Sequence, residues 1–280
     1  MRKLMSVFFV MLALFAKVQA FEKTGVKKFA PERDLLSLHY DHAPDKDDGQ
    51  SAAADRTILE AVFGTDWIKM HVVALSGAYG KNAKWFNAKS DIVMDAVWND
   101  CGDWLDGHAN REQVVAELTN RWIATIKAGG DVWVKEGGQS DITAAVVKRI
   151  RSQSPDVDTP KRIHVIQHSN WNEEQTTESA LAYTRKHTHY IKIRDANAYL
   201  NIKGGDREFV KAASEHPDFG KAWKAAFAYY NPHNRLDFSD SGELMHILGL
   251  GEIDIEGFRK RFLSDDETPN PNKLDASDGK

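Results

Sequence analysis

The sequence is poor in cysteine. It has a single one, Cys101, among 280 residues, so no disulfide can form within the chain and a hydrophobic core must stabilise the fold. A chain of this length with 42% hydrophobic residues can bury such a core unaided. A clustered basic surface is lacking too, because 41 Asp and Glu outnumber 37 Lys and Arg and leave a net charge of −4. This balance argues against a nucleic-acid partner, since such a protein must neutralise phosphates.

Long hydrophobic runs are also scarce. Mean hydropathy is −0.50, and the one long apolar run, at residues 5–16, excludes a polytopic membrane protein. Arg2 and Lys3 precede that run and Val18-Gln19-Ala20 follows it, which is the pattern of a signal peptide. A membrane anchor is the less favoured alternative, because twelve residues are too few to span ~30 Å of hydrocarbon as a helix. We predict a signal peptide at residues 1–20 and a secreted or periplasmic protein that has no membrane association after cleavage.

Apolar, β-rich runs alternate with helical patterns along the rest of the chain. This order predicts βαβ units and an α/β fold, with an open, mostly parallel sheet and helices on both faces. From about residue 206 the pattern becomes helical and aromatic, which predicts a helical C-terminal part. We expect one domain over residues 21–263 and a disordered tail over 264–280, which has almost no apolar residues. The strands are expected at 35–40, 68–75, 131–135, 163–167 and 190–193, and the helices at 51–63, 90–98, 111–127, 142–152 and 177–186.

The loop after the first expected strand is strongly acidic. Asp41, Asp45, Asp47 and Asp48 fall within eight positions, and Lys46 is the only basic residue among them. Ligands bind at the carboxyl ends of the strands in an open parallel sheet, and crowded carboxylates there need a positive partner. A hard cation such as Ca²⁺, or Mg²⁺, suits oxygen donors. A simpler alternative, favourable contact with the dipole of the following helix, explains only the last two acids. The sequence therefore predicts a divalent cation site.

Two other kinds of metal site fit this segment less well. An EF-hand loop that begins at Asp45 needs Gly at its sixth position and Glu at its twelfth, where Gln50 and Arg56 stand. A zinc hydrolase of the metallo-β-lactamase kind uses His-x-His-x-Asp-His, and residues 37–42 read Ser-Leu-His-Tyr-Asp-His. The first histidine is missing, and zinc would leave three of the four carboxylates unexplained. The zinc hydrolase stays open as a lesser alternative.

The same loop resembles a known family. The pattern Asp41-x-x-Pro44-x-x-Asp47-Asp48 is similar to the Asp-x-Asp-Pro-x-x-Asp-Asp signature of nucleoside hydrolases. These enzymes bind Ca²⁺ there and cleave the N-glycosidic bond of ribonucleosides. The loop is closer still to the nucleoside-hydrolase-like domain of some secreted cellulose-binding proteins, whose loop ends Asp-Asp-x-Gln-Ser, as residues 47–51 do. Residues 132–145 and 163–182 resemble two further segments of that domain. The resemblance covers about 34–250 and implies a nucleoside-hydrolase-like fold.

The resemblance also implies roles for particular acidic residues. Asp48 becomes the main metal ligand, and Asp41 becomes a ligand or a supporting carboxylate. The family's late aspartate, at the head of a helix, is best matched by Asp240, with Asp237 as the runner-up. Asp47 is then placed to hold ribose hydroxyls.

Polar and aromatic side chains after the other strands are candidates for binding and proton transfer. Asn170 or Asn172 matches the residues that hold the sugar, although both could instead cap the following helix. Trp85 could stack on a base or sugar ring, or pack against a helix. His168 follows a strand directly and is the candidate general acid for the leaving group.

One departure from the family concerns catalysis. The signature's second aspartate, which activates the attacking water, is replaced by Ala43. Asp45 is the only nearby carboxylate that could take over as the base. We therefore expect an exported, metal-dependent hydrolase that cleaves an N- or O-glycosidic bond beside a cis-diol, with a small nucleoside or sugar as substrate. The alternative is a non-catalytic glycan-binding or surface-associated domain that keeps the metal cradle. The sequence does not specify an oligomeric state.

Overall fold

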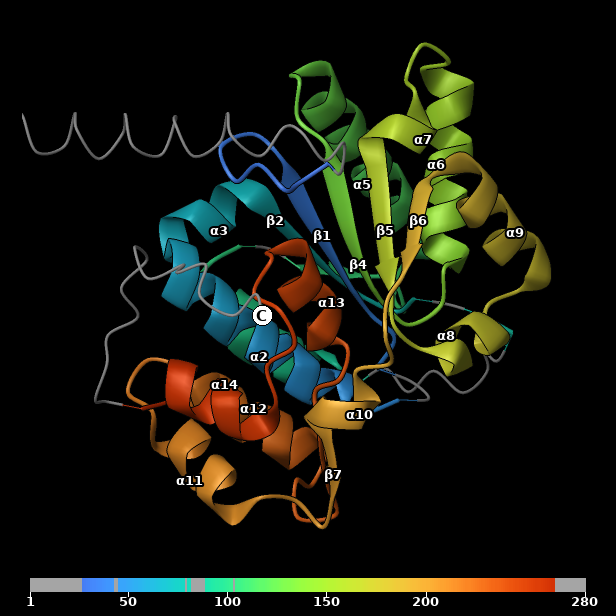
Figure 1. Ribbon diagram of the computed structural model, residues 1–280. Helices are drawn as coiled ribbons and strands as arrows, with labels where there is room; N and C mark the ends of the chain where they lie inside the picture. The colour runs from blue at the N-terminus through green and yellow to red at the C-terminus, as the bar shows by residue number, and fades with distance from the viewer. Residues whose placement is uncertain (1–26, 43–44, 79, 82–88, 103, 265–280) are drawn as a thin grey trace, which may run out of the picture.

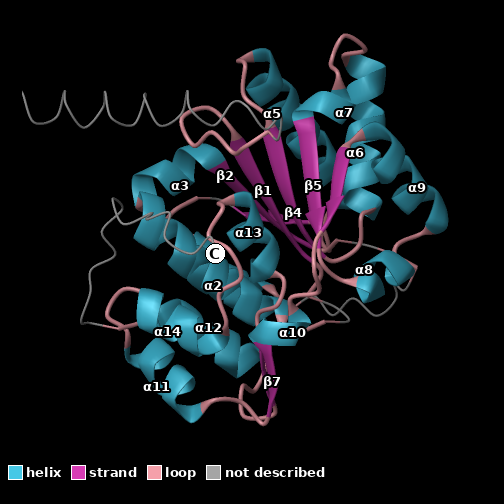
Figure 2. Ribbon diagram, in the orientation of Figure 1, coloured by secondary structure: helices cyan, strands magenta, loops and turns pink. Residues whose placement is uncertain are grey.

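The central element is a six-stranded parallel sheet. A computed structural model describes residues 27–42, 45–78, 80–81, 89–102 and 104–264. The strands follow the order β3-β2-β1-β4-β5-β6, and every neighbouring pair is parallel (Figure 2). The predicted α/β fold with an open parallel sheet is confirmed. The strands are β1 (Leu35–Tyr40), β2 (Val72–Ser76), β3 (Trp104–Asp106), β4 (Val132–Gly137), β5 (Ile163–Gln167) and β6 (His189–Lys192).

Helices cover both faces of the sheet (Figure 1). They are α2 (Asp48–Phe63), α3 (Thr65–His71), α4 (Asp91–Trp98), α5 (Arg111–Lys127), α6 (Asp141–Gln153), α7 (Thr159–Arg162), α8 (Asn170–Gln175), α9 (Glu178–His187), α10 (Asn197–Leu200), α11 (Arg207–Glu215), α12 (Gly220–Tyr229), α13 (Ser241–Ile247) and α14 (Ile255–Phe262).

Alternation along the strands divides the core into two layers. All six residues of β1 are buried, as is usual where both faces of a parallel sheet are covered. Leu36 and Leu38 face the layer that α2, α4, α12 and α13 close, whereas Leu35 faces the layer beneath α5 and α6. Helices on both faces, expected from the alternation of elements, are thus present.

The second expected strand is displaced. Residues 68–71 belong to α3, and β2 begins only at Val72. Ile68 is buried whereas Met70 is 70% exposed, so this segment buries one side of a helix rather than a continuous strand. The apolar run is shared between the end of a helix and a strand, which its composition alone does not separate.

The C-terminal part is helical around an aromatic cluster, with one addition. Phe209, Trp223, Phe238 and Phe258 are buried together, and α12 packs against α2. The helical prediction missed a two-stranded antiparallel sheet of β7 (Asn201–Lys203) and β8 (Arg235–Asp237). Among the described residues, no helix has the length and apolar character needed to cross a bilayer. The predicted signal peptide and nearly all of the predicted tail lie outside the described residues.

Candidate functional site

A pocket opens at the carboxyl ends of the strands. The strand order reverses between β1 and β4, so the chain leaves this point in both directions across the sheet. Open α/β sheets bind ligands at such a switch point. The pocket has a volume of about 550 Å³. It is lined by Asp45, Asp47, Asp48, Ser51, His168, Ser169, Trp171, Asn172, Asn197, Asn201, Arg235, Asp237, Ser239 and Asp240.

Most of the site residues expected from the sequence meet in this pocket. Asp41 lies buried next to it, at 1% exposure. Asn170 is exposed on α8 and does not line the pocket. Trp85 lies outside the described residues, as does Ala43. The lining instead includes Trp171, which the sequence analysis did not single out. The other expected residues that line it are Asp45, Asp47, Asp48, His168, Asn172 and Asp240.

The acidic loop turns sharply beneath the pocket. His42 has φ +50°, the only positive φ of a non-glycine residue in the described ranges, and such backbone strain concentrates at functional sites. The turn brings the backbone N–H of Asp41 within 3.1 Å of Asp48 Oδ1, to which it donates. Gln139 donates to Asp41 Oδ2 over 2.6 Å. Asp41 Oδ1 is buried without a hydrogen-bond partner in the described part of the chain.

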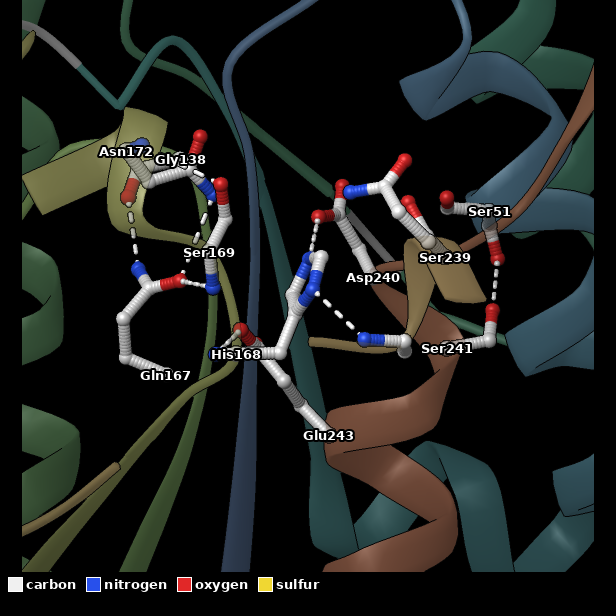
Figure 3. A network of polar contacts seen from close by, with 12 residues as sticks. Ser51, Gly138, Gln167, His168, Ser169, Asn172, Ser239, Asp240, Ser241 and Glu243 are labelled. Carbon is white, nitrogen blue, oxygen red and sulfur yellow. Dashed lines mark hydrogen bonds and ion pairs between the residues drawn. The ribbon is translucent and has the colours of Figure 1, made fainter. Parts of the chain in front are cut away.

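Asp240, the residue immediately before α13, lines the pocket. His168 Nε2 lies 2.9 Å from Asp240 Oδ1, and its Nδ1 lies 3.2 Å from Asp195 Oδ1. Figure 3 shows His168 between Asp240 and Glu243, whose Oε1 accepts from the His168 backbone N–H over 2.9 Å. Burial alone would lower the pKa of His168, but its two carboxylate partners raise it to about 10. The ring therefore carries a positive charge at neutral pH and is a weak acid.

A buried lysine supports the same cluster. Lys135, within β4, is fully buried, and its Nζ lies 3.5 Å from Asp55 Oδ2. Although burial lowers the pKa of Lys135, the charges of Asp55, Asp240 and Asp48 outweigh burial and raise it. Burial likewise opposes ionisation of Asp240, but Lys135 and then His168 hold its pKa at about 2. The floor of the pocket thus contains an ionised carboxylate between two cations.

These cations correct one premise of the sequence analysis. Within the loop Lys46 is the only basic residue, but Lys135, His168 and Arg235 come from distant segments to the same carboxylates. Arg235 Nε lies 3.2 Å from Asp237 Oδ2, and its Nη1 lies 3.9 Å from Asp47 Oδ2. Acidic side chains still outnumber basic ones in the lining of the pocket, because five carboxylates line it beside one arginine and one histidine.

The pKa values of the loop carboxylates reflect this excess of acidic side chains. Burial, and then the charge of Asp45, raises the pKa of Asp41 well above its usual range. Burial and the charge of Asp41 do the same for Asp48, and burial and a hydrogen bond with Asp45 do so for Asp47. Burial raises the pKa of Asp237 to about 6. A hard cation would favour the ionised form of these groups, and the free Asp41 Oδ1 is an available donor. The residues present therefore fit a divalent cation.

Another set of donors lies beside this one. Ligand atoms of His168, Asp240 and Glu243 lie within 4.8 Å of one another and could hold a metal ion. That use would require the His168 ring to lose a proton that two carboxylates stabilise. Burial raises the pKa of Glu243 to about 8, just as burial raises the pKa values of Asp41 and Asp48. A hard cation prefers the all-oxygen donors of the acidic loop, because a histidine nitrogen suits a softer metal.

The two histidines of the segment that resembles a zinc hydrolase motif, His39 and His42, lie in separate environments. His39 is fully buried, with Nδ1 3.2 Å from Glu136 Oε1 and Nε2 3.0 Å from Ser37 Oγ. His42 Nδ1 lies 3.2 Å from Ser76 Oγ. Both nitrogens of His39 are therefore engaged inside the core.

The amide side chains after β5 also have distinct roles. Ser169, rather than either asparagine, caps α8 by accepting from the backbone N–H of Asn172. Asn172 is 5% exposed and its Nδ2 donates to Gln167 Oε1 over 3.4 Å. Asn172 therefore lines the pocket as an amide held in place by Gln167.

Several lining residues carried no signal in the sequence. Asn197, Asn201, Arg235 and Ser239 come from short elements whose mutual position depends on how the C-terminal part packs on α2. Fold and pocket together define a doubly wound parallel α/β domain with an acidic pocket at its topological switch point. Comparison with protein-family models, with curated proteins and with solved structures found no match for this chain.

Proposed function

We propose that this domain is a metal-dependent hydrolase of nucleoside hydrolase type. It would bind Ca²⁺, or Mg²⁺, through Asp41, Asp48 and Asp240 and cleave an N- or O-glycosidic bond beside a cis-diol. The observation that carries the proposal is the convergence of Asp240 with Asp48. The two residues lie near opposite ends of the domain's sequence, yet both line the same pocket, and each carboxyl group affects the pKa of the other. This is the pairing that the resemblance to nucleoside hydrolases implies.

The remaining pocket residues divide the chemistry among them. A bound divalent cation polarises a water molecule and holds vicinal hydroxyls. Asp45, half-buried in the pocket, accepts the proton of the attacking water. Asp47 accepts hydrogen bonds from the sugar hydroxyls, and Asn172 donates hydrogen bonds to them. His168, which lines the pocket, keeps Asp240 ionised and acts as the general acid that donates a proton to the leaving group.

A non-catalytic glycan-binding or surface-associated domain is the second candidate. The observation in its favour is Ala43, which stands where nucleoside hydrolases carry the catalytic aspartate. A binder would keep the cation and the sugar-holding residues but need no base.

A single panel of substrates separates the two candidates. Purified protein is incubated with ribonucleosides and aryl glycosides, with Ca²⁺ or with a chelator, and bond cleavage is followed by absorbance. Calcium-dependent cleavage supports the hydrolase. If calorimetry shows that the same compounds bind but are not cleaved, the result supports the binding domain. If they are neither bound nor cleaved, the result contradicts both candidates.

Export belongs to the proposal on sequence grounds alone. Residues 1–20 have the charge, length and small-residue exit of a signal peptide. Protein isolated from its native source is expected to begin at Phe21. An N-terminus at Met1 would contradict this.

A further inference from the structure

Two histidines form a pair at the opposite end of the sheet from the pocket. His164, in β5, and His189, in β6, are register partners on adjacent parallel strands (Figure 1). Register partners point to the same face of a sheet. Their Nδ1 atoms lie 2.9 Å apart. His164 is 1% exposed, whereas His189 is exposed at the edge of the sheet.

The contacts of His164 determine which of its ring nitrogens carries a hydrogen and which has a lone pair. Its Nε2 lies 3.0 Å from Asp131 Oδ2, and an ionised carboxylate can only accept, so Nε2 carries the hydrogen. The lone pair of His164 therefore lies on Nδ1, where it accepts the Nδ1 hydrogen of His189. Metal-binding histidines are commonly oriented in this way, with the other ring N–H donated to a carboxylate.

The surroundings hold this arrangement in place. The His164 ring stacks on Trp133 with ring centroids 4.1 Å apart. Asp131 is held in turn by ion pairs with Arg162 and Lys27. These two cations outweigh the single carboxylate of Asp131. The site therefore attracts cations little by charge, and affinity must come from the imidazole nitrogens.

We propose that His164 and His189 form a binding site for a divalent transition-metal cation of borderline softness, such as Zn²⁺, Ni²⁺ or Cu²⁺. Zn–N bonds of about 2.0–2.1 Å in tetrahedral geometry place two ligand nitrogens about 3.3 Å apart, a few tenths of an ångström beyond the present separation. Rotation of the exposed His189 supplies that difference, its hydrogen moves from Nδ1 to Nε2 so that Nδ1 can bind the metal, and water completes the coordination. Ca²⁺ is excluded because it requires oxygen ligands. The site is independent of the acidic pocket and of its proposed chemistry.

The test uses the full mature chain without an affinity tag. Zn²⁺ binding is measured by calorimetry at saturating Ca²⁺, and Cu²⁺ is added to record nitrogen hyperfine coupling by electron paramagnetic resonance. Wild type is expected to bind one Zn²⁺ at this site and to show coupling to two nitrogens. His189→Ala should remove both signals, and because His189 is exposed the variant should remain folded. Asp131→Asn should weaken binding by about 10- to 100-fold.

The matched control is His187→Ala, two residues away, which should bind Zn²⁺ as wild type does. The proposal is overturned if wild type binds no Zn²⁺, or if His189→Ala binds it unchanged. It is also overturned if Zn²⁺ binding is lost in Asp240→Asn but kept in His189→Ala. That last result would assign the metal to the cluster of His168, Asp240 and Glu243.

Discussion

His168 Nε2 and Asp240 Oδ1 lie 2.9 Å apart although the residues are 72 positions apart in the sequence. The bond joins the end of β5 to the beginning of α13 (Figure 3). Because the ring is protonated and Lys135 lies nearby, Asp240 remains ionised at any pH above about 2. Asp240 is therefore an ionised oxygen donor on the floor of the pocket, and Lys135 and His168 balance its charge.

Ca²⁺ should stabilise the folded protein through the acidic loop. At a hundred times its Kd, a ligand that binds only the folded state adds about 2.7 kcal/mol. This would raise Tm by several degrees in a scanning fluorimetry titration. Asp48→Asn keeps the acceptor for the Asp41 N–H but loses a charge, and should abolish the rise. Asp66→Asn, on the exposed surface of α3, is the control that should respond as wild type does. A wild-type Tm that stays constant up to millimolar Ca²⁺ contradicts the metal site.

Asp45→Asn should separate catalysis from binding. The amide keeps the size of the carboxylate but cannot accept a proton, so kcat should fall by about 10²-fold or more. The Ca²⁺ affinity should change little, because Asp41, Asp48 and Asp240 remain. Lys46→Ala, in the same loop, should retain activity. If Asp45→Asn turns over at the wild-type rate, Asp45 is not the base.

Lys135→Met should leave buried carboxylates without their partner. Removing one member of a buried ion pair costs about 3–5 kcal/mol, so urea unfolding should show a loss of this size. The double variant with Asp55→Asn should recover part of it, since Asn keeps an acceptor for the Tyr40 hydroxyl. Ca²⁺ should raise the Tm of Lys135→Met more than that of wild type, because the site is then more negative. Full stability in the single variant would mean that Lys135 does not compensate these charges.

Glu173 should make stability depend on pH in the acid range. Burial opposes its ionisation, but hydrogen bonds from Tyr190 and Arg185 lower the pKa of Glu173 below its usual 4.5. A lowered folded-state pKa contributes stability that is complete above about pH 4.5 and is lost as the pH falls through the folded value. Glu173→Gln should therefore lower the free energy of unfolding at pH 7 by about 1 kcal/mol. The loss is no larger because the carboxylate is partly in contact with solvent, which screens its ion pairs.

That difference from wild type should shrink as the pH falls below 4.5, when unfolding is measured across pH. Glu174→Gln, on the exposed neighbour, should show no such pH dependence. A difference that persists unchanged at pH 3 would mean that the charge of Glu173 is not the stabilising feature.

The sequence by itself determined what depends on neighbouring residues. Continuous apolar runs predicted β1, β4 and β5 because both faces of these strands are buried, and the order of elements predicted a parallel sheet. The acidic loop could be located at a strand end because Asp41 and Asp48 are only seven positions apart. The run at 68–75 was wrongly predicted to be a single strand, since an apolar segment shared by a helix and a strand looks continuous.

Tertiary structure alone decided which distant groups meet at the site. Lys135 reads in the sequence as one polar residue within a buried strand, and only the pairing of β4 with β1 places its ammonium beneath Asp48 and Asp55. Arg235 reaches Asp47 only because β8 packs against α2. The physical reason is that these contacts depend on strand order and on helix packing across the whole domain. Local periodicity contains no information about either.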